Sequence, residues 1–272
     1  MNGALLAFTW RQQRVKLLVV AIALALFGML LVVVYAAFGR DLRAVLESGL
    51  IPQGMVDLMQ QLSGGGDIFS LAGSVALGMV HPISVALVCV FAVGFGSAAV
   101  AGERERGTLE VLLARPISRR AVYATLFVAL VLFVALAVAA QLVGVGIAAA
   151  ATGVSSELDV ANLPLLWLND VLLFVALGAI GLAASVSSDR LAPALGVTLA
   201  VTLTGYVLEF LGSVWPDAQG IQPFSPFHYL QPSQVLSGKG DPLDLLVLAG
   251  IAIVAVGYAL VVFPRRDLAA PT

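Results

Sequence analysis

The chain has 272 residues, of which 60% are hydrophobic and only 11% are charged, and its mean hydropathy is +1.03. A water-soluble domain of this length could not cover so much apolar surface with so few charges. The net charge of −2 argues against a nucleic-acid-binding face, and the single cysteine, Cys89, excludes a disulfide framework and a cysteine metal site.

The chain begins with an amphiphilic stretch, residues 4–16, in which apolar and aromatic side chains precede a basic cluster. This composition predicts an interfacial helix along the cytoplasmic leaflet, with Trp10 at the depth of the lipid headgroups.

Continuous apolar runs follow, each long enough to cross the hydrocarbon core, which takes about 20 helical residues. Open strands are excluded because their unpaired backbone groups cannot face lipid. The sequence therefore predicts an all-α integral membrane protein with one transmembrane domain, residues 1–272. Its six predicted spans are residues 17–38, 80–101, 122–151, 165–186, 191–212 and 243–263.

The basic residues predict the orientation of these spans. Of the 14 Lys and Arg residues, all but Arg40, Arg43 and Lys239 lie on one side of the predicted membrane. The positive-inside rule makes that side cytoplasmic, and an even number of spans places both termini there. We expect a multi-pass protein of a prokaryotic inner membrane.

The first outer segment, residues 39–79, is too long for a simple connection. Pro52 can open a short helix, and residues 68–79 form an interrupted apolar stretch that is either re-entrant or interfacial. We favour a helix lying on the outer membrane surface over a gate or a substrate lid. The apolar face of this helix comprises Met55, Leu58, Met59 and Leu62.

The cytoplasmic segment between spans two and three, residues 102–120, carries the most specific pattern. Charges alternate from Glu103 to Arg106, Gly107 permits a turn, and Thr108 is a predicted N-cap. Pro116 ends the short helix that follows, and Ser118 can cap the next one. The short helix has an apolar face made of Leu109, Leu112 and Leu113, with Glu110 in its first turn.

This segment, E-R-E-R-G-T-L-E-V-L-L-A-R-P-I-S-R, resembles the signature of ABC-2 type transporter permeases. Residues 225–230 before span six and residues 265–268 after it agree with the resemblance. One departure is that Ala124 and Thr125 stand where many relatives carry a Lys.

The resemblance implies a type V exporter-like permease that pairs with two copies of a separate cytoplasmic ABC ATPase and with a second permease copy as a homodimer. ATP and Mg²⁺ would be bound by the ATPase, because this chain has no G-x-x-x-x-G-K-[ST] loop and we expect no cofactor or catalytic residue in it. The short helix would be a coupling helix seated on the ATPase. Its implied contact residues are Glu103, Arg104, Glu105, Arg106, Gly107, Thr108, Leu109, Glu110, Leu112, Leu113, Pro116 and Arg119.

A translocation path is harder to place. The resemblance implies that spans one, two and five face the centre of the dimer. On span five, Thr198, Thr202, Tyr206 and Glu209 recur at helical spacing and could form a polar stripe. The hydroxyl groups could equally bond to their own backbone or to a neighbouring helix.

The nearly uncharged spans favour export of a hydrophobic or amphiphilic substrate, such as a drug or a lipid. Alternatives are a permease for ion or metal efflux, a secondary transporter driven by an ion gradient, and an intramembrane enzyme. The enzyme is disfavoured because H-E-x-x-H is absent and His81 and His228 lie near the ends of spans. Neither histidine has partners at metal-ligand spacing, so we expect no metal site.

Overall fold

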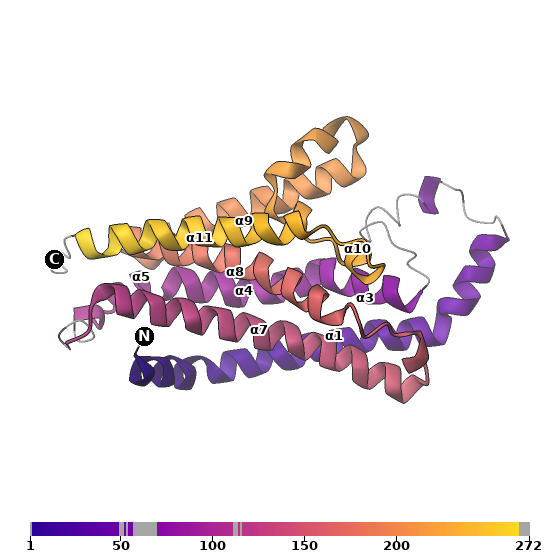
Figure 1. Cartoon of the computed structure of the whole chain (residues 1–272), viewed down its shortest axis with the longest axis horizontal. Helices are drawn as coiled ribbons and strands as arrows, with labels where there is room; N and C mark the ends of the chain where they lie inside the picture. Colours follow the sequence, from indigo (N-terminus) through magenta and orange to yellow (C-terminus); the bar gives the residue numbers. More distant parts are fainter. Residues whose placement is uncertain are drawn as a thin grey trace.

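The computed structural model describes residues 2–48, 52, 54–56, 70–110, 114 and 116–266, and within these it contains helices and no strand. The long helices lie side by side as an elongated bundle, with the N-terminus and the end of α11 at the same end (Figure 1). The elements are α1 Gly3–Glu47, α3 Leu71–Val80, α4 Pro82–Ala98, α5 Ala101–Glu105, α7 Arg119–Thr152, η1 Ser155–Glu157, α8 Leu163–Ser187, α9 Leu191–Val214, η2 Pro216–Phe224, η3 Pro226–Tyr229, α10 Pro232–Leu236 and α11 Pro242–Arg265.

Among the described residues, five helices are long and apolar enough to cross a membrane, and the bent pair α3–α4 makes up to six. Each predicted span falls on one of these helices. The predicted second span, residues 80–101, has different bounds in the structure, because α4 ends at Ala98 and the apolar helix α3 precedes it.

Helix α1 joins segments that the sequence suggested were separate. The predicted interfacial stretch and the first span form one helix of 45 residues, which continues into the predicted outer segment. At 1.5 Å per residue this helix is ~68 Å long, about twice the hydrocarbon thickness, so most of its excess length must lie outside the core.

The outer segment is only partly described. Residues 54–56 are helical, whereas Leu58, Met59 and Leu62 of the predicted amphipathic face lie outside the described residues. The apolar stretch before span two is the helix α3, capped by Ser70, whose hydroxyl accepts a hydrogen bond from Gly73 N at 2.9 Å. Leu71 of this helix is buried, so α3 belongs to the protein core.

A 42° bend separates α3 from α4. Pro82 has no N–H, so the carbonyl of Gly78, four residues earlier, loses its helical partner. Gln141 of α7 replaces it, since its Nε2 donates to Gly78 O at 2.8 Å and lies 3.2 Å from Ser84 Oγ. His81 caps α4 through its Nδ1, which accepts from Ile83 N, as a capping role predicts.

Glycines set the closest helix contacts. A Cβ on Gly144 of α7 would stand 2.1 Å from the carbonyl oxygen of Ala25 in α1, and Gly178 and Gly181 of α8 are similarly crowded. The absence of a side chain at these three positions allows the helices to pack closely. Gly146, two residues along α7 from Gly144, has open space around it.

The spans differ in how far the protein itself covers them. The most apolar window of α8 is 72% buried, whereas those of α1, α9 and α11 are 22% buried. Helix α8 is therefore central, and the apolar outer faces of the other three are left for lipid or for another protein.

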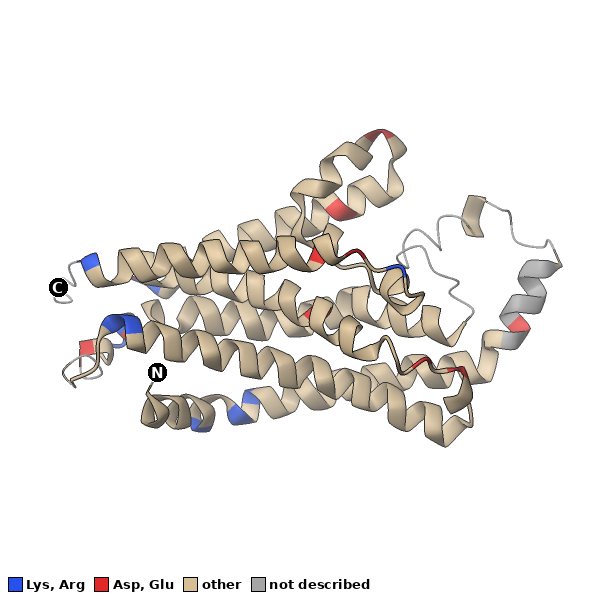
Figure 2. Cartoon of the chain, viewed as in Figure 1, with Lys and Arg blue, Asp and Glu red and all other residues tan. Residues whose placement is uncertain are grey.

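Charge is distributed unevenly along the bundle. Most Lys and Arg residues gather at the end that carries both described termini (Figure 2). Arg104 and Arg266 meet at Asp189 at this end, which shows that the connections after α4, α8 and α11 lie together.

Candidate functional site

The segment after α4 is anchored to α8 at its start. The Oγ of Ser185 accepts hydrogen bonds from Val100 N at 3.0 Å and Ala101 N at 2.8 Å. These are two N–H groups at the beginning of α5, which have no partner within the helix. A buried serine from another span therefore fixes the direction in which the chain leaves the bundle.

A turn stabilised by its own side chains follows α5. Gly107 has φ +70°, a left-handed conformation that favours glycine. Glu103 pairs with Arg106, and the hydroxyl of Thr108 lies 3.1 Å from the carbonyl oxygen of Glu103 and also contacts its carboxylate. Thr108 is predicted to cap the following helix; its hydroxyl donates backwards into the turn, and the helix that it would cap continues into residues outside the described ones.

The remaining charges of the motif reach the connection between α8 and α9. Arg104 forms an ion pair with Asp189 at 2.8 Å. Glu105 Oε2 accepts a hydrogen bond from Leu191 N at 2.9 Å, which places a carboxylate at the N-terminus of α9. These charges were predicted to face an ATPase, and in the structure they also tie α5 to two spans.

Arg119 connects the end of the segment to α11. Its Nη1 donates to the carbonyl oxygens of Phe263 at 3.2 Å and Arg266 at 2.6 Å, so a guanidinium caps the C-terminus of α11. Ser118 caps α7, as predicted, by accepting from Ala121 N at 3.2 Å.

The predicted leucine face is only partly available. Leu109 is 2% exposed and belongs to the core, so it anchors the segment and is not free to fill a groove of a partner. Leu112 and Leu113 lie outside the described residues. Gly107, Glu110 and Pro116 are exposed, so part of the segment's surface is open to a partner.

The predicted polar stripe on α9 is turned toward the protein. Thr198 and Thr202 are buried, and their hydroxyls donate to the carbonyl oxygens of Ala194 and Thr198, each at 2.8 Å. Ser97 of α4 lies 3.2 Å from Thr198 Oγ1. The alternative considered for these hydroxyls, bonding to their own backbone and a neighbouring helix, is what the structure shows.

Tyr206 and Glu209 contact the segment that follows α9. Tyr206 packs edge-on against Phe227 with ring centroids 5.5 Å apart. Glu209 accepts from Gln222 Nε2 at 3.0 Å and lies 3.5 Å from His228 Nδ1. These two residues thus hold η2 and η3 against α9, a contact that sequence spacing did not indicate.

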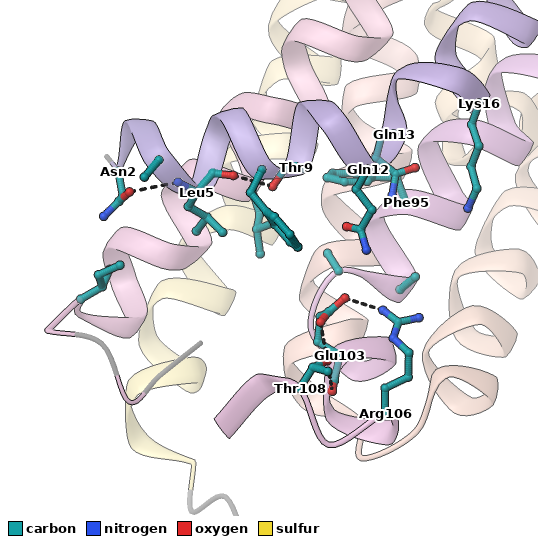
Figure 3. A pocket seen from close by; sticks show the side chains of 16 residues that line it. Asn2, Leu5, Thr9, Gln12, Gln13, Lys16, Phe95, Glu103, Arg106 and Thr108 are labelled. Atoms are coloured by element: carbon teal, nitrogen blue, oxygen red, sulfur yellow. Dashed lines mark hydrogen bonds and ion pairs between the residues drawn. The ribbon is translucent and has the colours of Figure 1, made fainter. Parts of the chain in front are cut away.

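Between the N-terminal part of α1 and the segment after α4 lies a pocket of about 560 Å³ (Figure 3). Its lining includes Glu103, Arg106 and Thr108 of the turn, together with residues from α1, α4 and α7. Sequence analysis does not predict this pocket, because its walls come from stretches far apart in the chain.

Comparison with known proteins assigns this arrangement to a family. The family model described as ABC-2 family transporter protein matches residues 9–268. The match includes every helix from α3 to α11 and most of α1. A comparison with curated proteins found no match.

Proposed function

The chain belongs to the ABC-2 family of transporter proteins and is the multi-pass membrane permease subunit of an ABC transporter, and we propose that this transporter exports a hydrophobic or amphiphilic substrate. Two permease copies would work with two cytoplasmic ATPase subunits, which bind ATP and Mg²⁺. The Lys- and Arg-rich end of the bundle would face the cytoplasm (Figure 2).

The observation that carries the coupling part of this proposal is the set of contacts made by residues 103–119. Arg104 and Glu105 reach the α8–α9 connection, and Arg119 reaches the end of α11. A displacement of this exposed segment by an ATPase would therefore be transmitted to α8, α9 and α11. This gives the segment a route for turning ATP-driven movement into movement of the spans.

The apolar outer faces of α1, α9 and α11 support a homodimer, because such faces can be covered by a second copy as well as by lipid. Thr198 and Thr202 are enclosed by their own chain, so they are not proposed as the path in this conformation. The path would form along other faces of these helices when the bundle rearranges.

Affinity purification of the tagged permease in mild detergent, with mass spectrometry of the proteins that accompany it, tests the ATPase partner. We expect an ABC ATPase at about one copy per permease. Replacing Leu112 and Leu113 together by Asp, or Glu110 by Arg, should abolish its recovery. Lys239→Asp, an exposed charge change at the opposite end, is the matched control and should retain the ATPase.

Size-exclusion chromatography of each variant shows whether the permease remains folded. A folded wild-type permease that recovers no ATPase would contradict the proposal. Equal recovery in wild type and in the Leu112–Leu113 double variant would place the contact elsewhere on the chain.

A further inference from the structure

The pocket beside the turn has a strongly apolar inner wall. Leu5 of α1, Phe95 of α4 and Leu126 of α7 line it and are at most 7% exposed. Phe8, also in the lining, is 58% exposed and stands at its edge. Side chains from three helices thus form a surface suited to a hydrocarbon chain.

The rim of the pocket is polar and carries an excess of positive charge. Lys16 and Arg106 contribute two cations and Glu103 one anion, so the lining has a net charge of +1 (two minus one). Gln12 and Lys16 extend from α1 toward the turn that holds Glu103 and Arg106 (Figure 3). The rim can therefore donate hydrogen bonds from two sides to one anionic group.

The pocket also adjoins a surface that lipid can reach. Phe8 of the lining and Val15, two turns further along the same face of α1, are 58% and 65% exposed and are apolar. In the orientation proposed above, this surface lies at the depth of the inner leaflet. An amphiphile could thus enter sideways from the bilayer, without passing through water.

We propose that this pocket binds one anionic amphiphile of the inner leaflet, with its phosphate or other acidic headgroup at Lys16 and Arg106 and its chain against Phe95 and Leu126. A volume of about 560 Å³ is in the range of small-molecule sites. Basic pockets between membrane helices on the cytoplasmic side bind anionic lipid headgroups.

A bound ligand would contact α1 and the turn at the same time. Since Arg106 also pairs with Glu103, the occupied pocket would hold the turn against α1 and so favour one position of the coupling segment. The ligand would be either a resident phospholipid or the transported substrate on its way into the protein. Both sources share the chemistry of an acidic headgroup and an apolar chain.

The test uses the full-length permease in nanodiscs of phosphatidylcholine with and without phosphatidylglycerol, followed by delipidation in mild detergent and native mass spectrometry. We expect one phosphatidylglycerol retained per chain in preference to phosphatidylcholine. Lys16→Gln should reduce this retention at least fivefold, and Ala99→Phe, which fills the pocket from the end of α4, should abolish it.

Two controls match these variants. Arg14→Gln removes a charge from the same part of α1 outside the pocket lining, and Ala150→Phe adds the same volume at an exposed position of α7. Both should retain the lipid as wild type does. Equal retention of the two lipids, or unchanged phosphatidylglycerol retention in Ala99→Phe, would overturn the proposal.

This binding measurement contains no ATPase, so its failure would leave the proposed transport function standing. If Ala99→Phe lost the ATPase but kept the lipid, the pocket would be a protein contact and the proposal would be wrong. Adding the ATPase and ATP separates the two sources of the ligand. A resident lipid would stay bound through turnover, whereas a substrate would be released; either result supports an amphiphile site.

Discussion

Gln141 illustrates how one side chain compensates for a break in a membrane span. Pro82 lacks the N–H that would bond to Gly78 O. Inside a membrane no water is present to donate a hydrogen bond to an unpaired carbonyl oxygen. The Gln141 amide donates to that oxygen at 2.8 Å from the middle of α7. The bend between α3 and α4 is thus supported by a buried polar residue of a neighbouring span.

Replacing Gln141 by Met should lower the free energy of unfolding by about 1–3 kcal/mol, because it leaves Gly78 O buried and unpaired. Pro82→Ala restores an N–H that can bond to Gly78 O, so the same Gln141 replacement should cost less in that background. Thermal unfolding in detergent of the four proteins of this cycle measures the coupling. Additive effects would mean that Gln141 does not replace the missing N–H.

Leu109 and Glu110 are neighbours with opposite roles. Leu109 is 2% exposed and Glu110 is exposed, so Leu109→Ala should cost about 2–5 kcal/mol of stability, and Glu110→Ala no more than about 0.5 kcal/mol. Unfolding midpoints of the two variants check this. Similar midpoints would indicate that Leu109 is not held in the core.

At the scale of helices, the contact of α1 with α7 depends on the absence of a side chain at Gly144. Gly144→Leu would force the two backbones apart, since a Cβ alone would approach Ala25 O to 2.1 Å. We expect this overpacking to lower the free energy of unfolding by about 1–3 kcal/mol. Gly146→Leu, two residues along the same helix in open space, is the control and should be nearly neutral, as judged by thermal unfolding.

The contacts of Asp189 hold the segments that follow α4, α8 and α11 in position, and they contribute little to the free energy of unfolding. Asp189 has 66% of its side chain exposed, whereas Arg104 and Arg266 have 15% and 23%, so water reaches both pairs from the carboxylate side and we expect each to contribute about 1 kcal/mol. Asp189→Ala should therefore leave the unfolding midpoint within a few degrees of wild type while lowering the amount of substrate moved per ATP hydrolysed. A proteoliposome assay that measures transport and hydrolysis together checks this ratio. An unchanged ratio would exclude Asp189 from the coupling route.

The sequence predicts the helices well, because a span must be continuously apolar and its caps are local. The Ser118 cap of α7 follows from such a local rule. Contacts between residues that are far apart in the chain do not follow from local rules. Helical spacing puts Leu109 on an apolar face and Thr198 on a polar one, but it cannot say whether a neighbouring helix already covers them. For the same reason the sequence predicts contacts of residues 103–106 with an external partner and does not indicate their contacts within the chain.

For the molecule as a whole, the extent of burial agrees with a protein that uses lipid or a second copy as part of its surroundings. Among the five described helices that are each long enough to span a membrane, α8 is the one whose most apolar stretch is mostly buried within the chain, at 72%. In the proposed orientation the Lys- and Arg-rich end of the bundle faces the cytoplasm, because positive charge is retained there (Figure 2). The two termini lie on the same side of the membrane only if the number of spans is even, which requires the bent pair α3–α4 to cross as one span. Orientation and span number are therefore linked through this pair.

Cysteine labelling tests that link. In a Cys89→Ser background, single cysteines at exposed positions would be placed after α4 (Glu110→Cys), after α7 (Ser156→Cys) and before α11 (Ser237→Cys). A membrane-impermeant maleimide added to intact cells should label Ser156→Cys and Ser237→Cys, and should label Glu110→Cys only after permeabilisation. Labelling of Glu110→Cys alone in intact cells would mean that the bundle has the opposite orientation in the membrane. Labelling of Glu110→Cys and Ser156→Cys together would require an α7 that does not cross the bilayer, which its 34 residues and hydropathy of 2.8 make untenable. A result of that kind would therefore point to loss of the native fold in the variants, which size-exclusion chromatography of each variant would check.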